Sequence, residues 1–275
     1  MSRSFAVLIN NFNNGRFVGE CVESALRQTR AADEVIVFDD GSDDDSLKVL
    51  EGFKGHIRLL RGRRDEGPVG HRARAGRAQF EGFKVSRADW CLFLDGDDYF
   101  DPNRIESYEA ALDARPEASL IQSPLRSVDE SGKPLPLQWD DRFEVSNPLA
   151  HIRATNDCDL FFPTSALALP RRALRQILPL NFQFVPEIAA DTRMSIAALF
   201  HGPIINLAEV TGAWRRSPHG LSGAASRERW YLVRLTVWRT ELFNSYARAH
   251  AERELSLWKN RRFYLRVARA LLRPR

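Results

Sequence analysis

Two runs of acidic residues are the part of this sequence best suited to chemistry, and each follows an apolar segment. Asp39-Asp40-Gly41-Ser42 follows Glu34–Phe38, and Asp95-Gly96-Asp97-Asp98 follows Trp90–Leu94. Carboxylates in tight turns can hold Mg²⁺ or Mn²⁺, since these hard cations prefer oxygen ligands and can retain water or phosphate oxygens. Each run alone is also compatible with an ordinary turn. Together, their five carboxylates would repel one another strongly without a cation, so the sequence predicts a metal site if the two runs meet.

The surrounding elements indicate that they do meet. Four apolar segments are typical of strands buried on both faces: Phe5–Ile9, Glu34–Phe38, Ile57–Leu60 and Trp90–Leu94. Helical patterns lie between them, as in Val18–Gln28, where apolar residues recur at helical spacing. This alternation predicts an α/β fold with a mostly parallel, doubly wound sheet. Ligands bind beyond the carboxyl ends of such strands, so we expect the polar loop Asn10–Asn14 and both acidic runs at one edge.

Later elements are less regular. Asp101-Pro102 has the signature of a helix start, with aspartate as the N-cap and proline at the first helical position. From Leu120 onward short strands and prolines alternate, and helical patterns return at Arg171–Ile177 and Asp191–Phe200. We expect a mixed α+β part that continues the same domain.

Length and composition fit a globular protein. The 275 residues, 44% of them hydrophobic, suit one large domain with an appendage or two small domains. Charges interrupt every apolar stretch well before about 18 residues, so we expect neither a signal peptide nor a membrane span. Cys21, Cys91 and Cys158 have no paired spacing, which argues against a zinc site or a disulfide framework and favours a reducing cytoplasm.

The C-terminal segment differs in charge from the rest. Residues 225–275 hold 13 basic residues and 4 glutamates, a net charge of +9 against −5 for the remainder. An acidic body argues against nucleic acid as a partner. Aromatic and leucine residues recur on one face of a predicted helix: Tyr231, Leu235, Trp238, Leu242 and Tyr246. This basic amphipathic extension could pack on the rest of the chain, form a homodimer, or make peripheral contact with an anionic membrane surface.

Four segments together are specific, and they agree in order and spacing with a known family: Val7–Asn13, Ser24–Thr29, Glu34–Ser42 and Leu92–Asp98. The chain resembles the inverting glycosyltransferase family 2, which has the Rossmann-like GT-A fold, closely over the first 115 residues and loosely over 156–222. The resemblance implies a GT-A domain at 1–224, with a nucleotide-binding half at 1–115 and an acceptor-binding half at 116–224. Residues 225–275 would form a C-terminal helical extension.

The resemblance also implies a pocket for a nucleoside-diphosphate sugar. In it Asp40 contacts the donor base, with Asn10, Asn13 and Asp39 nearby. UDP is the expected nucleotide by family frequency, with GDP and dTDP as alternatives.

The same family pattern implies a Mn²⁺ or Mg²⁺ site. Asp98 would be the main metal ligand, Asp97 would face the ribose and the metal, and Asp95 would act through water. Arg215 or Arg216 would pair with phosphate oxygens, because guanidinium suits bidentate contacts, and His219 would ligate the metal or touch the diphosphate. A plain surface loop is the alternative for His219.

An inverting transfer needs a base that deprotonates the acceptor hydroxyl. Asp191 stands where the family has this carboxylate, before a helix, and Glu187 is the reserve candidate. A helix N-cap is the structural alternative for Asp191.

Departures from the family bear on the donor. Asn10 replaces the usual proline or threonine, Phe80-Glu81-Gly82 replaces an Asn-x-Gly, and the basic segment 61–77 is longer than usual. Two other functions remain open, a nucleotidyltransferase and a degenerate GT-A scaffold that only binds. The expected function is transfer of a sugar to a saccharide or lipid-linked saccharide in bacterial polysaccharide or glycoconjugate synthesis, in the cytoplasm or at the inner face of the membrane.

Overall fold

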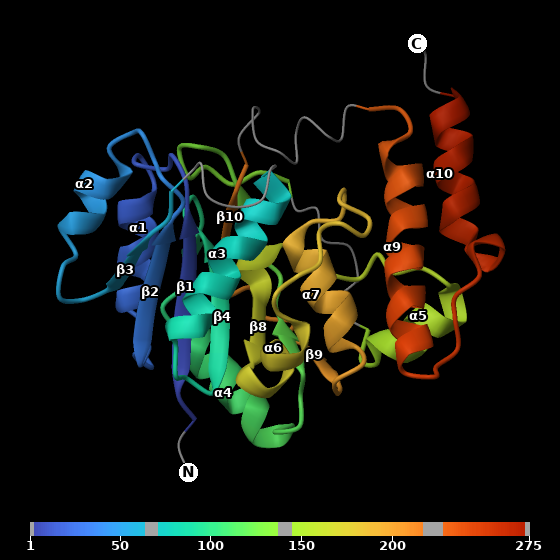
Figure 1. The fold of residues 1–275 in the computed structure, drawn as a ribbon, viewed down its shortest axis with the longest axis horizontal. Coiled ribbons are helices and arrows are strands. Elements are labelled where there is room, and N and C mark those ends of the chain that lie inside the picture. The colour runs from blue at the N-terminus through green and yellow to red at the C-terminus, as the bar shows by residue number, and fades with distance from the viewer. Residues whose placement is uncertain (1–2, 64–70, 137–144, 217–227, 273–275) are drawn as a thin grey trace.

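The computed structural model describes residues 3–63, 71–136, 145–216 and 228–272. Its centre is a seven-stranded sheet in the order β3-β2-β1-β4-β8-β6-β9 (Figure 1). The strands are β1 (Phe5–Asn11), β2 (Glu34–Asp39), β3 (Arg58–Arg61), β4 (Trp90–Asp95), β6 (Leu120–Gln122), β8 (Leu167–Pro170) and β9 (Ile204–Asn206). Only β8 runs against its two neighbours within this sheet. The predicted α/β class and mostly parallel sheet are therefore confirmed.

The strands form from apolar residues that are buried on both faces of the sheet. In β1, Phe5, Val7 and Ile9 face one apolar cluster, whereas Ala6 and Leu8 face the other. The first cluster is covered by α1 (Val18–Leu26), α2 (Ser46–Glu51) and α4 (Arg104–Ala114). The second lies under α3 (His71–Val85), α6 (Arg171–Ile177) and α7 (Ala190–Ala198) (Figure 1). Two layers of helices thus enclose the sheet and leave its carboxyl edge for the site.

A three-stranded sheet lies beside this edge. It joins β5 (Tyr99–Phe100), β10 (Gly212–Arg215) and β7 (Arg126–Val128). A Cβ at Gly212 would come within 2.8 Å of the Tyr99 carbonyl oxygen, so only glycine lets β10 approach β5 this closely. This pairing brings Arg215 next to the acidic turn after β4.

Two helix starts differ from the sequence-based prediction. Asp101 is not the N-cap of α4, which begins at Arg104 after Asn103. The carboxylate of Asp101 instead accepts two hydrogen bonds from Arg126, at 2.5 and 2.6 Å, and this ion pair removes it from the helix end. Asp191 is not an N-cap either, because α7 begins at Ala190 and the capping position is Ala189.

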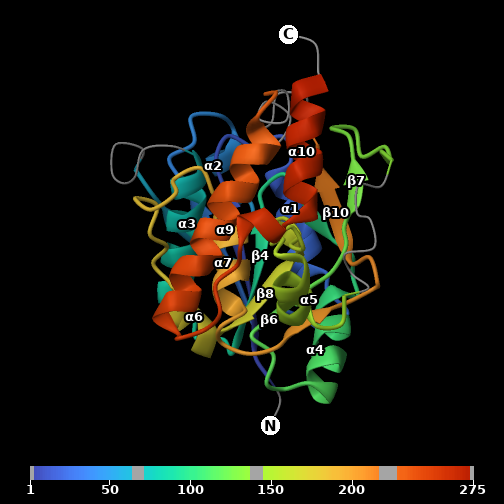
Figure 2. The ribbon, with the colours of Figure 1, turned by 90° about the vertical axis from the view of Figure 1, so that its right-hand side faces the viewer.

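The C-terminal segment forms α9 (Tyr231–Ala249), the short helix η3 (Leu257–Lys259) and α10 (Arg261–Leu272). Leu242, Phe243 and Ala247 of α9 are buried in the same apolar cluster as α7. Helix α10 lies along the outside of α9 (Figures 1 and 2). The extension therefore packs on the α/β body, one of the arrangements expected from the sequence. In the described parts of the chain no helix combines the length and the apolar character that crossing a bilayer requires.

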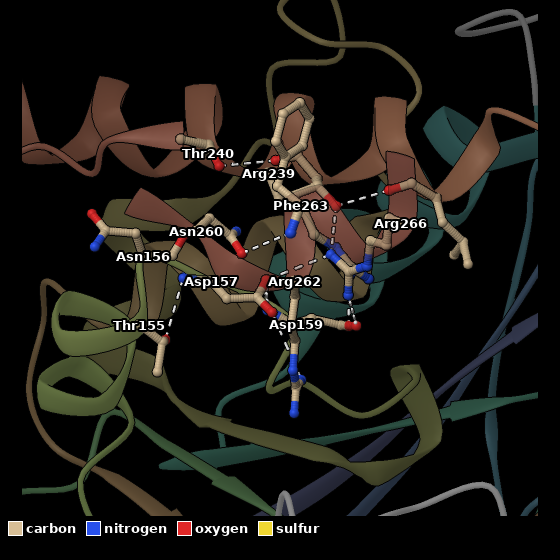
Figure 3. Close-up of polar contacts among 12 residues, drawn as sticks. Thr155, Asn156, Asp157, Asp159, Arg239, Thr240, Asn260, Arg262, Phe263 and Arg266 are labelled. Carbon is tan, nitrogen blue, oxygen red and sulfur yellow. Dashed lines mark hydrogen bonds and ion pairs between the residues drawn. The ribbon is translucent and has the colours of Figure 1, made fainter. Parts of the chain in front are cut away.

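A buried ion-pair cluster fixes both C-terminal helices to residues 155–159 (Figure 3). Asp159 accepts hydrogen bonds from Arg239 of α9 and from Arg266 of α10, both at 2.6 Å. Asp157 lies 3.6 Å from Arg266 and 3.7 Å from Arg262. Asp159 is 18% exposed, so water screens these pairs only weakly. The cluster therefore links α10, α9 and the loop that leads to β8.

We expect the substitution Asp159→Asn to destabilise the protein by about 3 kcal/mol, because it leaves two largely buried arginines without this carboxylate. The melting temperature should fall by roughly 5–10 °C, measured by calorimetry. Asp113→Asn is the matched control, because Asp113 pairs with Arg3 while its own side chain is 72% exposed, and such pairs contribute less than about 1 kcal/mol. Equal melting temperatures for the two variants would contradict this assignment.

Candidate active site

The loops after β1 and β2 are tied together by side chains that the sequence placed in the nucleotide pocket. Asp39 is buried and accepts hydrogen bonds from Asn11 Nδ2 at 2.7 Å and from the hydroxyl of Ser42 at 2.6 Å. Asn13 donates to Asp43 at 2.6 Å and accepts from the Asp43 backbone N–H at 2.9 Å. Asp39 and Asn13 therefore shape the rim of the site through their contacts within the protein.

Asp40 has a different environment, at the end of β2. Its buried carboxylate lies 3.0 Å from Arg74 Nη1 and 3.5 Å from Arg77 Nη1, both on α3. The Oδ1 atom of Asp40 has no hydrogen-bond partner within the described residues. Gly62 lies against it, and a Cβ there would come within 3.2 Å of Oδ1 and 2.6 Å of Phe38 Cζ. This arrangement leaves a buried acceptor with two arginines beside it.

The turn after β4 holds the second acidic run. The hydroxyl of Ser165 donates to Asp98 Oδ2 and accepts from the Asp95 backbone N–H at 3.0 Å. The other carboxylate oxygen of Asp98 accepts from the Arg215 backbone N–H at 2.7 Å. Asp98 is therefore buried and held at both oxygens.

Strand register places Asn10 next to this turn. Asn10 of β1 lies opposite Asp95 of β4, and its side chain hydrogen-bonds the Asp95 carboxylate. The Gly96 backbone N–H donates to the Asn10 carbonyl at 2.9 Å. A Cβ at Gly96 would come within 2.7 Å of Asn11 Oδ1. Glycine at this position thus lets the acidic turn pack directly on the β1 loop.

Without a bound cation, ionising the carboxylates of the acidic turn costs free energy in the folded protein. Burial and the neighbouring carboxylate of Asp97 raise the pKa of Asp95 to about 7, and Asp191 contributes to the same rise. Burial, and then the charges of Asp97 and Asp95, raise the pKa of Asp98 well above its ordinary value. Burial also raises the pKa of Asp97. A nearby divalent cation would favour the ionised form of all three, so this donor set fits Mg²⁺ or Mn²⁺.

These carboxylates are not a complete metal cage. Among the described residues, no three or more histidine, cysteine, aspartate or glutamate side chains are arranged to hold a metal ion. His219, the other expected metal ligand, lies outside the described residues. The chain thus offers part of a coordination sphere, which suits a cation that keeps phosphate oxygens and water.

Arg215 stands beside the turn, but its guanidinium is already engaged. It donates to the Asp97 carbonyl at 2.6 Å and to Glu20 Oε2 at 2.7 Å. Its Cζ lies 4.5 Å from the Phe17 ring centroid and 5.5 Å from that of Tyr99. In this arrangement Arg215 braces the acidic turn against α1 and does not present a free guanidinium to a phosphate.

Asp191 faces the same turn from α7, where it is the second helical residue. The Thr192 backbone N–H donates to its Oδ1 at 2.5 Å. Burial raises the pKa of Asp191, while hydrogen bonds from Thr192 and the positive charge of Arg239 oppose that rise. Glu187, the reserve candidate, is 48% exposed and lies 3.6 Å from Arg72. Of the two carboxylates, Asp191 is the one coupled to the acidic turn.

Several residues of the site could not be identified from the sequence alone. Ser165 and Glu20 belong to no recognisable sequence motif, and only their positions in the fold show that they hold the acidic turn. Arg74 and Arg77 belong to a basic segment that is visible in the sequence, yet their contact with Asp40 requires α3 to pack over β2.

Comparison with known proteins identifies the family to which the chain is similar. The family model for glycosyl transferase family 2 matches residues 6–178. Glycosyltransferase GlyG of Streptococcus pneumoniae serotype 4 is 29% identical over 131 residues, covering 48% of this chain and 42% of GlyG. A relative from Nostoc is 26% identical over 213 residues, which cover 76% of this chain and 64% of that protein. The chain thus spans less than two thirds of the length of either relative.

Solved structures support the fold. Residues 1–349 of Staphylococcus aureus TarS, in complex with UDP, superpose with a TM-score of 0.56 at 17% identity, covering 90% of this chain and 71% of that one. The mannosyltransferase PcManGT of Pyrobaculum calidifontis, in complex with GDP-Man and Mn²⁺, has a TM-score of 0.61 at 13% identity and covers 99% and 71%. Since the family model matches well over half of the 275 residues, the chain belongs to glycosyl transferase family 2.

Proposed function

We propose that this protein is a metal-dependent, inverting glycosyltransferase that moves a sugar from a nucleoside-diphosphate sugar to an acceptor hydroxyl. The observation that carries the proposal is the buried acidic turn after β4, whose carboxylates repel one another, with Asp191 coupled to it from α7. Such a turn is costly to fold unless a cation and a diphosphate use it.

The donor base is proposed to lie at the end of β2. The Oδ1 of Asp40, which accepts no hydrogen bond from the described residues, can accept the imide N–H of uracil, and the absence of a side chain at Gly62 leaves room beside it. Arg74 and Arg77 hold the carboxylate in place through ion pairs. We propose UDP as the nucleotide. TarS has been solved with UDP and with UDP-GlcNAc, whereas GDP-Man in PcManGT makes GDP the alternative.

The diphosphate is proposed to lie over the acidic turn. Asp97 and Asp98 would hold Mn²⁺ or Mg²⁺, with Asp95 acting through water, and the bound cation would neutralise charge that develops on the departing nucleoside diphosphate. Ser165 and the Arg215 backbone fix both oxygens of Asp98, so this carboxylate needs little rearrangement to bind. Arg215 holds the turn through Asp97 and Glu20.

Asp191 is proposed as the general base. It takes the proton of the acceptor hydroxyl while that oxygen forms a bond to the anomeric carbon, and the bond from that carbon to the phosphate oxygen breaks. Burial suits this role, because a raised pKa strengthens the carboxylate as a base. Attack from the face opposite the leaving group inverts the anomeric centre.

The acceptor is proposed to be a saccharide or a lipid-linked saccharide in bacterial surface polysaccharide synthesis. One relative, TarS of Staphylococcus aureus, is named a poly(ribitol-phosphate) β-N-acetylglucosaminyltransferase and is 22% identical over 94% of this chain and 44% of TarS. We place the enzyme in the cytoplasm, in peripheral contact with the inner face of the membrane.

Calorimetric titration tests the donor site. We expect UDP to bind in the presence of Mn²⁺ and to bind at least about ten-fold more weakly with chelator, because the acidic turn repels a bare diphosphate. GDP and dTDP should bind more weakly than UDP. Asp45→Asn, which removes an exposed carboxylate near the same edge, is the control and should bind like the wild type.

Two outcomes would overturn the proposal. Equal UDP affinity with and without metal would remove the cation from the mechanism. Release of pyrophosphate instead of UDP, when the enzyme is incubated with nucleotide sugars, would indicate a nucleotidyltransferase.

A further inference from the structure

Helix α10 has an apolar face that no described residue covers. Phe263 and Val267 are half-buried and Ala270 is buried, and α10 contacts α9. The opposite stripe is exposed and apolar, and it consists of Tyr264, Leu265, Ala268, Leu271 and Leu272. Leu272 is 84% exposed, and Trp258, just before the helix, is 75% exposed. Exposure of such an apolar stripe to water costs free energy, and burying it against a partner or a bilayer removes that cost.

Positive charge borders this stripe. Residues 255–275 hold seven basic residues and no acidic residue. Arg261 and Arg269 are exposed on the same helix, whereas Arg262 and Arg266 are directed to Asp157 and Asp159. Long arginine side chains can reach headgroups while leucines enter the acyl boundary.

We propose that α10 is an in-plane helix that docks this enzyme on an anionic lipid bilayer. The exposed stripe enters the interface, and the bordering arginines contact lipid phosphates. This inference deepens the location given under the proposed function and rests on it. It adds the residues that make the contact and the class of lipid.

Charge complementarity favours a bilayer over a second copy of the chain. A two-fold contact between two α10 stripes would bring Arg261 and Arg269 of both copies together. The stripe carries no carboxylate with which to pair them. Glutamates nearby in the sequence are already paired, since Glu252 contacts Arg153 and Glu254 contacts Arg248. An anionic surface provides the negative charge that the second copy lacks.

The fold also determines which end of the molecule would lie near the bilayer when α10 is docked. Strand β1 starts near the N-terminus, so the carboxyl edge of the sheet lies at the end of the molecule where α10 finishes (Figure 1). Ion pairs of Arg262 and Arg266 with Asp157 and Asp159 hold α10 to the body (Figure 3). A docked α10 would thereby keep the active-site edge close to lipid-linked acceptors.

Flotation of the full chain with vesicles tests the proposal. Vesicles of phosphatidylcholine with 30% phosphatidylglycerol should recover the protein, and vesicles of phosphatidylcholine alone should recover little. The double variant Leu265→Ser/Leu272→Ser should lower the partition coefficient at least ten-fold. Arg261→Gln/Arg269→Gln should lower it roughly 25-fold, at about five-fold per charge. All four positions are exposed, so the melting temperature should stay unchanged.

The control is Leu232→Ser/Val237→Ser, which changes exposed apolar residues of α9 and should float like the wild type. Three results would overturn the proposal: no flotation of the wild type, equal losses in the control, or a dimer that the α10 variants convert to a monomer. UDP binding without vesicles, measured on the same variants, reports separately on the proposed function. It should be unchanged, and its absence in the wild type would count against the transferase and not against the docking helix.

Discussion

The Asp98→Asn variant should lose about 10³-fold in kcat/KM for the nucleotide sugar. Without metal, its free energy of unfolding should be at least as large as that of the wild type. The activity falls because an amide is a poorer cation ligand and carries no charge to hold the metal against the departing diphosphate. The protein remains stable because burial and two neighbouring carboxylates raise the pKa of Asp98, so its ionised form is disfavoured in the fold. An asparagine can still accept a hydrogen bond from the Arg215 N–H.

The opposite signs of the two effects separate a functional role from a structural one. Because the pKa values of Asp95 and Asp98 are raised in the folded chain, both groups cost stability as the pH rises above the ordinary carboxyl range. Removing one of them should relieve part of that cost, and adding Mn²⁺ to the wild type should relieve it too. The measurements are UDP release and calorimetric melting, with Asp45→Asn as the control. A less stable variant that kept its activity would show that Asp98 only supports the fold.

The sequence predicted well those features that depend on local patterns. Phe5–Ile9 and Trp90–Leu94 read as buried strands because continuous apolar runs of that length have few other uses, and both are strands in the structure. Their parallel arrangement followed from the helices between them. The juxtaposition of Asn10 with the acidic turn could therefore be anticipated, and the register of β1 and β4 places Asn10 opposite Asp95.

Features that depend on distant partners could not be predicted. Asp101 looked like a helix cap, but Arg126 binds its carboxylate through the three-stranded sheet. Arg215 was expected near the phosphates, but its ion pair with Glu20, which precedes it by 195 residues, was not expected. Ser165 holds Asp98 from 67 residues away. No periodicity or spacing records these contacts, because they arise only when β8 and β10 are in place.

Replacing Asp191 by asparagine should lower kcat by about 10²–10⁴-fold and leave UDP affinity within two-fold, because a general base acts on the acceptor and not on the nucleotide. The variant keeps the size and the hydrogen-bond acceptor that the Thr192 N–H uses. Glu187→Gln is the matched control. Glu187 is half-exposed and pairs with Arg72 at the surface, so this variant should keep most of its activity.

The pH profile distinguishes a base from a residue that only shapes the site. Burial raises the pKa of Asp191, and only the ionised carboxylate can take a proton. The kcat of the wild type should therefore fall as the pH drops through a value above the ordinary carboxyl pKa, and this acid limb should vanish in Asp191→Asn. Arg239 attracts the Asp191 anion and opposes the rise in its pKa, so Arg239→Gln should move the limb to higher pH. An acid limb that persists in Asp191→Asn but disappears in Glu187→Gln would transfer the role of base to Glu187.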